Sequence, residues 1–577
     1  MRLSDNQPIA FEKHYDQKLD VATINGILNK YEIITFNGNK YDIPLLKLAL
    51  TGVDCAVLKD ASDKIIHENL PFYQFEREYK LNDSRFNHVD IIELCIGKAS
   101  LKTYAGRLHC QKMQDLPIEP NAHIRPDQRE ILKEYCHNDL VNTKHLLDEI
   151  KPQLELRREM SKEYRLDLRS KSDSQIAEAV IKSEIIKTNG KIAKTEKESN
   201  FFHYDVPGFI KPSTNKLYAV LEILEKSPFS LTNSGSVEMP KELSSMKIKI
   251  GKSTYQMGIG GLHSQEKSVN HKEDAIFLLA DWDVTSYYPS IILNCELFPK
   301  QLGSQFLEVY RQIVAERIYA KQVGLIVKSE ALKIVLNGSF GKFGSPYSIL
   351  FAPKLMIQVT ITGQLALLCL IDRLEELGVN VVSANTDGIV VKCQRNREDL
   401  MKRIIKEWET VTGFNMERSD YQSLYSRDVN NYIAIKTDGK VKTKGTFVSA
   451  NIKKNPQNEI CSLAIIEFLT KGTPIEDTIH SCKEITKFVT LRNVQGGAVK
   501  NNVYLGKVIR WYYAKNTQGT INYKTNNNSV PKSTGANPLM QLPKEFPKDV
   551  NYDWYIKETK ELLNDIGIHS IGQMNLF

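Results

Sequence analysis

Residues 276–290 read IFLLADWDVTSYYPS, an apolar run followed by aspartates and then by a turn that contains a proline. A short apolar run bounded by turn-forming residues is typical of a buried strand. A second segment, VVSANTDGIVV at 381–391, reads as a hairpin with Asp387 at its tip. Together the two segments predict that Asp283 and Asp387 lie at the ends of neighbouring strands.

Two helices are predicted between these strands, within 306–340, and they are separated near Gly324. Arg317 and Lys321 on the first helix are four residues apart, so they share one face. The second helix repeats this spacing with Lys333, Asn337 and Gly341. One face is therefore basic, and the absence of a side chain at its glycine leaves room for a flat base pair.

The two carboxylates and the basic face suggest phosphoryl transfer. Carboxylates on adjacent strands can hold two Mg²⁺ ions about 3.5–4 Å apart, which clamp the attacking and leaving oxygens of an in-line displacement. Taken singly, strand-end aspartates are more commonly turn formers, and charged helix faces are more commonly solvated. The combination favours a site at Asp283 and Asp387, while Asp281 lies on the same strand face and competes for metal.

The composition is that of a folded protein with several domains. Of 577 residues, 41% are hydrophobic and 25% charged, which excludes disorder and fibrous repeats. At roughly 100 to 200 residues per domain, we expect about three to five packed units. The formal charge of +8 permits a polyanionic partner without requiring one. Nine scattered cysteines without a CxxC pair indicate a reduced protein without structural zinc.

Other patterns outline the rest of the chain. It opens with a predicted strand at 31–36 and a helix at 44–50, a boundary is predicted near residue 150, and a long helix at 352–377. Beyond 450 helical patterns return, interrupted by the polar tract 515–538, which we expect to be a mobile loop. No membrane span or signal peptide is recognisable, which favours a cytoplasmic protein with no membrane partner.

Three motifs, in order, carry a family resemblance. DVTSYYPS (283–290) resembles the DxxSLYPS motif of family B DNA polymerases, KIVLNGSFG (333–341) resembles KxxxNSxYG, and ANTDGI (384–389) resembles YxDTDS. Weaker matches are Glu316-Arg317 with Lys321, Thr443-Lys444-Gly445, and GIGGLHS at 258–264. The resemblance covers roughly residues 31–515. It implies a DNA-directed DNA polymerase that adds deoxynucleotides to a primer 3′-hydroxyl and releases pyrophosphate.

The resemblance also implies a multidomain α/β and α+β fold, with an RNase H-like exonuclease domain followed by right-hand palm, fingers and thumb. The implied domains are an exonuclease-like domain at 1–150, a connecting region at 151–270, a palm at 271–298 and 345–445, fingers at 299–344, and a thumb with the C-terminal tail at 446–577.

Residue roles follow from the same resemblance. Asp283 and Asp387, with the Val284 carbonyl, would bind two Mg²⁺ ions, for which Mn²⁺ is a substitute. Tyr288 would lie beneath the incoming sugar and exclude a 2′-hydroxyl. Lys333 would also be the acid for the departing pyrophosphate. The implied nucleotide contacts are Ser286, Tyr287, Tyr288, Arg317, Lys321, Lys333 and Asn337, with Phe340 beside the base pair, and the implied DNA contacts are Gly260, Gly261, Tyr432 and Lys444.

The chain departs from the family pattern at several positions. Asn385 stands where the family usually has the first aspartate of DTD, and Gly388 replaces the serine that follows. Because the first aspartate is commonly the less essential of the two, we expect activity to survive. Val429-Asn430-Asn431-Tyr432 keeps only the tyrosine of the KKxY thumb motif, which weakens the expected grip on the primer strand.

An incomplete proofreading domain is expected near the N-terminus. Segment 37–42, with Asn37 and Asp42, resembles the second exonuclease motif, and Tyr135 with Asp139 resembles the third. The first motif, D-x-E, does not occur in residues 1–36. We expect little 3′–5′ exonuclease activity from this chain alone. The start is truncated, or split from an upstream chain that completes the site, or the nuclease has decayed into a scaffold.

Further partners are expected on weaker grounds. Gln573, Leu576 and Phe577 belong to a terminal QMNLF that resembles the peptide with which bacterial replication proteins bind the β sliding clamp. The short interval between Ser290 and Lys333 favours a nucleic-acid primer over a protein primer. Small size favours a phage or other mobile-element enzyme, which would work in the bacterial cytoplasm. The alternatives are a two-metal nuclease and a catalytically silent DNA-binding replication subunit.

Overall fold

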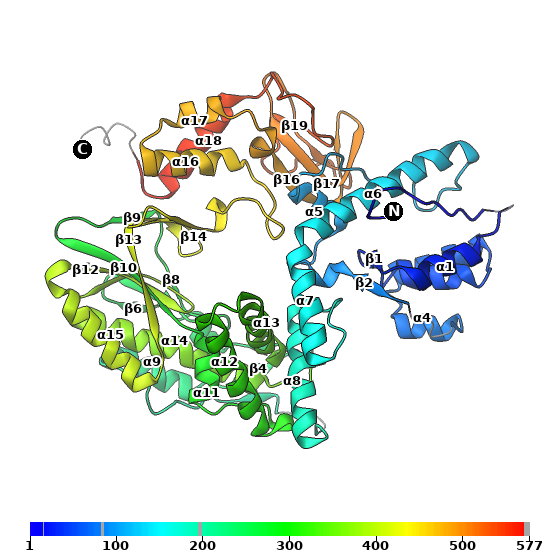
Figure 1. Ribbon diagram of the computed structural model, residues 1–577. Coiled ribbons are helices and arrows are strands. Elements are labelled where there is room, and N and C mark those ends of the chain that lie inside the picture. The colour runs from blue at the N-terminus through cyan, green and yellow to red at the C-terminus, as the bar shows by residue number, and fades with distance from the viewer. Residues whose placement is uncertain (15–16, 82–85, 194–198, 570–577) are drawn as a thin grey trace. The chain divides into compact units, whose positions relative to one another are not determined.

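The computed structural model describes residues 1–14, 17–81, 86–193 and 199–569 (Figure 1). Its contacts divide the chain into two units, each assembled from separate stretches. Unit 1 comprises Met1–Ser172, Ala450–Glu459 and Lys483–Asn551, and unit 2 comprises Asp173–Ser449, Ile460–Cys482 and Tyr552–Phe577. Both contain helices and sheets, which confirms a mixed fold of more than one part. The first division falls after Ser172, whereas the sequence placed a boundary near 150.

Unit 2 is built on a ten-stranded sheet in the order β15-β14-β13-β10-β12-β11-β8-β7-β6, with β9 beside β13. The strands pair antiparallel, and β10 carries the first aspartates between β12 and β13. Strand bounds are β6 (Ile248–Ile250), β7 (Ser253–Gln256), β8 (His263–Ser264), β9 (Val269–Lys272), β10 (Phe277–Val284), β11 (Asn380–Asn385), β12 (Gly388–Gln394), β13 (Met416–Asp428), β14 (Asn431–Lys436) and β15 (Val441–Lys444). The predicted strand and hairpin are thus both present.

Helix α14 (Pro353–Glu376) is the core helix of unit 2. It is long and apolar enough to cross a membrane by length and composition, but 89% of its most apolar window is buried inside the protein. Its polar residues are satisfied internally, since Thr362 shares a hydrogen bond with Tyr204 (2.8 Å) and the Gln364 amide donates to the Gly258 carbonyl (2.8 Å). Because these polar side chains have hydrogen-bond partners inside the protein, the helix can lie in an apolar core.

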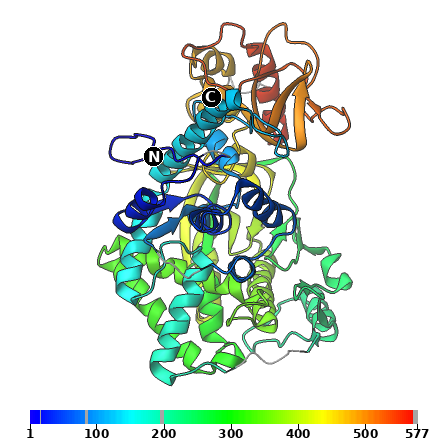
Figure 2. The same ribbon diagram turned by 90° about the vertical axis from the view of Figure 1, so that its right-hand side faces the viewer.

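Helices α12 (Gln305–Gln322) and α13 (Ile326–Phe343) form the predicted pair, separated around Gly324. Helix α8 (Asp173–Asn189) packs along α13 (Figures 1 and 2). The approach is close because Gly338 has no side chain, and a Cβ there would lie 2.5 Å from the Asp173 carbonyl oxygen. The other elements of unit 2 are α9 (Asn215–Lys226), α10 (Lys241–Ser244), α11 (Tyr287–Asn294), α15 (Glu398–Thr412), α17 (Ile475–Ser481), α18 (Tyr552–Asp565), and the sheet of β3 (Phe201–Phe202), β4 (Phe229–Leu231) and β5 (Val237–Glu238). Helix α16 (Glu459–Lys471) begins at the division between units.

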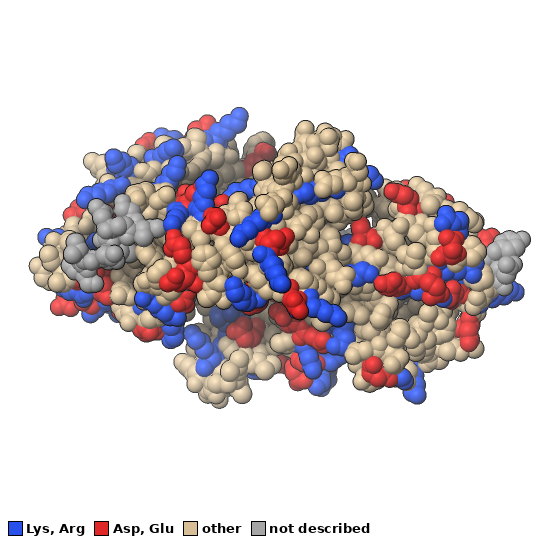
Figure 3. Space-filling model, turned by 90° about the horizontal axis from the view of Figure 1, so that it is seen from above, with Lys and Arg blue, Asp and Glu red and all other residues tan. Residues whose placement is uncertain are grey.

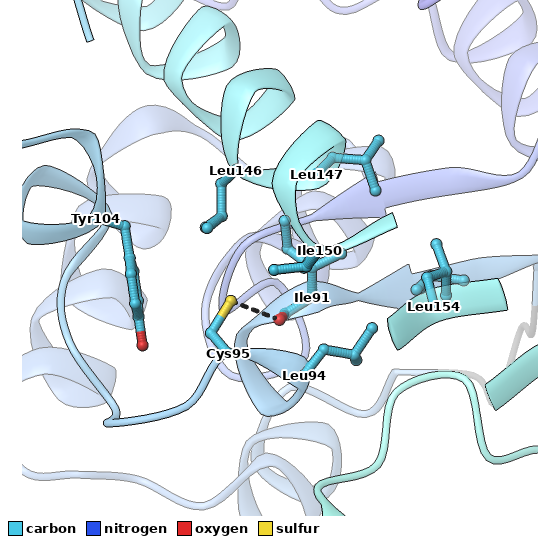
Figure 4. Packing of buried hydrophobic residues seen from close by; sticks show 9 residues of the cluster. Ile91, Leu94, Cys95, Tyr104, Leu146, Leu147, Ile150 and Leu154 are labelled. Carbon is cyan, nitrogen blue, oxygen red and sulfur yellow. Dashed lines mark hydrogen bonds between the residues drawn. The ribbon is translucent and has the colours of Figure 1, made fainter. Parts of the chain in front are cut away.

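Unit 1 begins with the predicted strand β1 (Ile33–Thr35), which pairs in parallel with β2 (His88–Asp90). A core cluster adjoins this pair, where buried side chains from β2 and the segment after it meet those of three helices (Figure 4). Within it Cys95 donates a hydrogen bond to the Ile91 carbonyl (3.2 Å). The helices of unit 1 are α1 (Val21–Lys30), α2 (Asp42–Leu50), α3 (Cys55–His67), α4 (Phe72–Glu78), α5 (Leu101–Arg107), α6 (Arg129–Glu149) and α7 (Lys151–Tyr164).

The region beyond 450 corrects the sequence interpretation. Besides helices it contains the long hairpin of β16 (Thr490–Lys500) and β17 (Val503–Tyr513), flanked by β18 (Asn522–Tyr523) and β19 (Ala536–Pro538). The tract 515–538, expected to be a mobile loop, is hydrogen-bonded into this sheet, with Val530 N–H donating to the Ile521 carbonyl (2.8 Å). Its polar composition reflects turns that are fixed by backbone and hydroxyl partners.

Candidate active site

Asp283, near the end of β10, and Asp387, in the turn between β11 and β12, lie beside each other where these neighbouring strands of the ten-stranded sheet end. Asp283 is paired with Gly388 in the register of β10 and β12. The next residue, Val284, donates its backbone N–H to the Asp387 carbonyl (2.7 Å). This places the turn that carries Asp387 directly beside the end of β10, and both aspartates are exposed to solvent.

Gly388 makes room for the Asp283 carboxylate. A Cβ at position 388 would lie 2.1 Å from Asp283 Oδ1, well inside contact distance. The serine that the family usually carries after DTD would therefore collide with the carboxylate as it lies here. Gly388 therefore allows the Asp283 carboxylate to lie where it does, and a side chain at 388 would make that carboxylate rotate away.

A cavity of about 470 Å³ opens beside the two aspartates. Its walls come from β10, the β11–β12 hairpin, β13, β14 and β15. Five charged side chains line it: Asp281, Asp283, Asp387, Lys442 and Lys444. With three carboxylates and two ammonium groups, the cavity is acidic by one formal charge. Of the five predicted metal and DNA-contact positions that are not glycine, four line this cavity: Asp283, Asp387, Tyr432 and Lys444. The fifth, Val284, is not among the residues that line it.

The carboxylates in this cavity are poised for a cation. Partial desolvation and the neighbouring Asp281 carboxylate raise the pKa of Asp283 to about 6, against the opposing pull of Lys442. Partial desolvation also raises the pKa of Asp387. Burial is the largest cause of both pKa shifts, and the Asp281 carboxylate adds to each. A divalent cation bound here would favour the ionised form of both carboxylates.

Asp281 is held inside the protein rather than presented to solvent. Its side chain is 6% exposed and accepts hydrogen bonds from the Tyr421 hydroxyl and from Lys442 Nζ (3.0 Å). Lys442 Nζ also lies 3.7 Å from Asp283 Oδ2, whose side chain is 51% exposed. The geometry therefore leaves Asp283 as the more accessible metal ligand of the two.

The predicted triphosphate side chains come from α12 and α13. Arg317 donates from Nη1 to Ser286 Oγ (2.9 Å), and its buried Nε has no partner among the described residues. Lys321 lies 3.7 Å from Glu417, and Lys333 forms an ion pair with Glu330 (3.3 Å) on its own helix. On the same helix Asn337 is exposed, and a Cβ built at Gly341 would meet open space.

The two tyrosines that open α11 differ in their surroundings. Tyr288 donates its hydroxyl to the Gly260 carbonyl (3.0 Å), and its ring centroid is 4.4 Å from that of Phe340. Tyr287 is buried, with its hydroxyl on the Gly363 carbonyl (2.6 Å). The Tyr287 side chain belongs to the core, so a nucleotide contact there would have to use the backbone.

The glycine-rich segment lies against the hairpin. Gly261, at φ +152°, approaches so closely that a Cβ would lie 2.8 Å from Thr386 Oγ1. Thr386 N–H donates to the Leu262 carbonyl (2.8 Å). The structure thus brings the predicted glycine-rich contacts next to the turn that carries Asp387.

The exonuclease-like residues lie in unit 1. Asp42 begins α2, and desolvation with the nearby Asp90 raises its pKa. On α6, burial raises the pKa of Asp139 against the opposing effect of the Tyr135 hydroxyl. The buried Oδ1 of Asp139 has no hydrogen-bond partner among the described residues. Asn37 has a left-handed conformation and donates its N–H to Asp90 (2.8 Å). The Tyr135 ring faces Lys102 at 5.6 Å.

A divalent metal at this site would be held by few protein ligands. Among the residues that the structure describes, no group of three or more His, Cys, Asp or Glu side chains is arranged to hold a metal. Mg²⁺ commonly uses one or two carboxylates and completes its octahedron with water and substrate phosphate oxygens. Asp283 and Asp387 fit that pattern. The predicted clamp peptide, Gln573 to Phe577, lies outside the described residues.

Sequence reasoning missed Lys442 and Tyr421. Both line the cavity and both contact Asp281. One signal for Lys442 was present in the chain, since it alternates with Lys444 in a short strand and therefore shares its face. No local pattern marks Tyr421.

Side chains of opposite charge are interspersed on the face seen in Figure 3. A broad patch of one sign does not cover that face, in keeping with the modest formal charge of +8.

Comparisons with known proteins give partial matches. No family model matches the chain. DNA polymerase 1 of Saccharolobus solfataricus is 27% identical over 145 residues, 24% of this chain and 16% of the relative. DNA polymerase 2 of Aeropyrum pernix is 26% identical over 120 residues, 20% of this chain and 15% of the relative. The matches thus span about a sixth of these curated relatives.

One solved structure, of the family B DNA polymerase from the hyperthermophilic archaeon Pyrobaculum calidifontis, aligns with 97% of this chain and 73% of its own. The identity is 14% and the TM-score 0.43, a level that adds no weight to the sequence matches. Part of this chain is therefore similar in sequence to archaeal DNA polymerases.

Proposed function

We propose that the chain is a DNA-directed DNA polymerase of the family B type, which extends a primer 3′-hydroxyl with deoxynucleotides by two-metal phosphoryl transfer. The proposal depends on one observation: Asp283 and Asp387 lie beside each other at the ends of neighbouring strands, next to the turn that Arg317 contacts. The partial likeness to named DNA polymerases supports the same reaction class.

The chain's own residues have distinct parts in this reaction. Asp283 and Asp387 hold the divalent cations, which when bound supply charge stabilisation to the attacking and leaving oxygens. Arg317, Lys321 and Lys333 neutralise the triphosphate, and Lys333 donates a proton to the leaving pyrophosphate. Tyr288, fixed by its hydroxyl on Gly260 and by ring contact with Phe340, gives the sugar pocket a rigid floor.

The proposal extends to the parts of the fold. The ten-stranded sheet would be the palm, and α12 with α13 the fingers. Tyr432 and Lys444, neighbours across β14 and β15, would face the primer strand near the cavity. The region around β1 and β2 would be an exonuclease-like domain with little activity in this chain alone. Cytoplasmic location and a clamp contact through Gln573, Leu576 and Phe577 are parts of the same proposal.

Primer extension with deoxynucleotides and Mg²⁺ tests the function. We expect the chain to lengthen a primer on a template, and Asp387→Asn to lower the rate by about 1,000-fold or more, since it removes one of two metal carboxylates. Asp438→Asn is the matched control, because Asp438 lies in the β14–β15 turn and pairs with Lys440. Shortening of the primer would instead identify a nuclease.

A silent DNA-binding subunit is the second candidate, and Asn385 is the observation in its favour. The Asn385 amide donates to the Val429 carbonyl (3.1 Å), so the side chain is engaged in the fold. A primer that is bound but unchanged, equally with the unaltered chain and with Asp387→Asn, would establish this candidate and end the polymerase proposal.

A further inference from the structure

Asp281 and Lys442 form a contact that the proposed reaction does not use. The Asp281 carboxylate is nearly buried and lies on the same face of β10 as Asp283. Lys442 comes from β15, three strands away in the sheet order, and its Nζ lies 3.0 Å from Asp281 and 3.7 Å from Asp283. The ammonium group therefore lies between the two carboxylates.

Asp281 is poorly placed to bind metal itself. Its Oδ2 accepts from both the Tyr421 hydroxyl and Lys442 Nζ, and its side chain is 6% exposed. Leaving a buried carboxylate without partners is costly, and these two donors supply partners that hold the side chain in place. Asp281 thus acts on the cavity as a fixed charge and as an anchor for Lys442.

The balance of charge beside Asp283 depends on this pair. Lys442 offsets Asp281 and also attracts Asp283, so it competes with any cation that approaches from the cavity. Loss of Asp281 alone would leave Lys442 with Asp283 as its nearest carboxylate. Loss of Lys442 alone would leave the cavity more acidic. Loss of both side chains would return the formal charge of the cavity to its value in the unaltered chain.

We propose that Asp281 and Lys442 are positioning residues that set the affinity of the Asp283–Asp387 site for its divalent cation. The inference rests on the proposed metal site and adds its regulation by residues outside the metal ligands. Asn385 gives this pair added weight, because the usual carboxylate at that position is absent and Asp281 supplies a third negative charge to the cavity instead.

Binding of Mn²⁺ alone to the full chain, measured by electron paramagnetic resonance without DNA or nucleotide, tests the inference. Binding at the proposed site is the Mn²⁺ binding that the unaltered chain shows and that Asp387→Asn loses. We expect Asp281→Asn to raise the dissociation constant about tenfold and Lys442→Met to lower it about tenfold, from the change of one charge close to the ion. The double variant should return to within about threefold of the unaltered chain.

Two controls separate charge from structure. Lys440→Met removes the same charge from an exposed lysine that pairs with Asp438, and should leave the dissociation constant unchanged. Tyr421→Phe removes one hydrogen bond to Asp281 without changing charge, and should lower stability but not Mn²⁺ affinity. If Asp281→Asn does not fold, Lys442→Met and the double variant carry the test.

Equal affinities for Lys442→Met and Lys440→Met would overturn the inference, as would tighter binding by Asp281→Asn or the absence of any Asp387-dependent Mn²⁺ signal. Failure of the proposed function has a different signature. A chain that binds Mn²⁺ and responds to Lys442→Met, but does not extend primers, would keep the inference and refute the polymerase. A chain that extends primers with Mn²⁺ affinities unchanged would do the reverse.

Discussion

Arg317 on α12 donates a hydrogen bond from Nη1 to Ser286 Oγ at 2.9 Å. Ser286 lies between the end of β10 and the start of α11, in a left-handed conformation with φ 50°. The contact therefore ties a helix to the strained turn that follows Asp283. Because Arg317 Nε is buried and has no partner among the described residues, the guanidinium keeps a donor for another acceptor.

The first prediction concerns this donor. Arg317→Ala should raise the KM for deoxynucleotides about 10- to 100-fold, since hydrogen bonds to charged groups contribute about 1.5–3 kcal/mol. Arg311→Ala, on an exposed position of the same helix, is the control and should change KM little. Steady-state primer extension measures both. An unchanged KM in Arg317→Ala with reduced kcat would contradict a role in nucleotide binding.

Gly388 is the subject of the second prediction. Gly388→Ala places a Cβ where Asp283 Oδ1 now lies, so the carboxylate must move. Displacement of a reacting group by about 1 Å costs roughly 100-fold in rate, and we expect a loss of that size in primer extension. Gly208→Ala, where a Cβ meets open space, is the matched control. Full activity in Gly388→Ala would show that the observed Asp283 position is dispensable.

Sugar selection gives the third prediction. Tyr288→Ala should increase ribonucleotide incorporation about 100-fold relative to deoxynucleotides, because it removes the ring that would meet a 2′-hydroxyl. Tyr288→Phe keeps the ring against Phe340 and loses only the bond to Gly260. It should therefore retain discrimination. If both variants lose discrimination equally, the hydroxyl and not the ring selects the sugar.

The elements around the site were predictable because their signals are local. The apolar run before Asp283, the hairpin around Asp387 and the break at Gly324 are each contained within a short stretch, and β10, β11 with β12, and α12 with α13 match them. The roles of the site residues stay predictions, since geometry places the side chains without testing their chemistry.

Two features could not be predicted from the sequence: the contact between Lys442 and Asp281, and the β16–β17 hairpin. Lys442 reaches Asp281 from β15, a pairing that no local spacing encodes. The β16–β17 hairpin was missed because Gly496 and Gly497, both at positive φ, interrupt the alternation of β16 and shift its register. A bulge of this kind breaks the period of two on which strand prediction depends.

The fourth prediction concerns unit 1. The chain alone should remove a mismatched 3′ nucleotide no faster than its Asp139→Ala variant, since two carboxylates of the usual four are recognisable in the sequence. Asp139 lies on α6 one turn after Tyr135, and its buried Oδ1 has no hydrogen-bond partner among the described residues. Release of labelled nucleotide from a mismatched primer measures this. Degradation that Asp139→Ala abolishes would show a competent nuclease and would contradict the expectation.

The fifth prediction is a pH dependence of stability in unit 1. Burial, and then the nearby Arg510, lower the pKa of His109 to about 4. Its buried Nδ1 has no hydrogen-bond partner among the described residues, so the folded protein keeps this ring neutral. The unfolded chain binds the proton near the ordinary histidine pKa of about 6.5, and so it gains a proton that the folded form does not.

Stability from His109 is therefore complete above about pH 6.5 and is lost progressively as the pH falls towards 4. His109→Asn removes the titration, and asparagine tolerates the left-handed φ of 52° at this position. Between pH 7 and pH 4.5 the unaltered chain should lose about 2 kcal/mol more than His109→Asn, measured from urea unfolding midpoints. His123→Asn, at an exposed site, should follow the unaltered chain. Parallel pH profiles for His109→Asn and the unaltered chain would mean that the His109 ring takes up its proton as readily in the fold as in the unfolded chain.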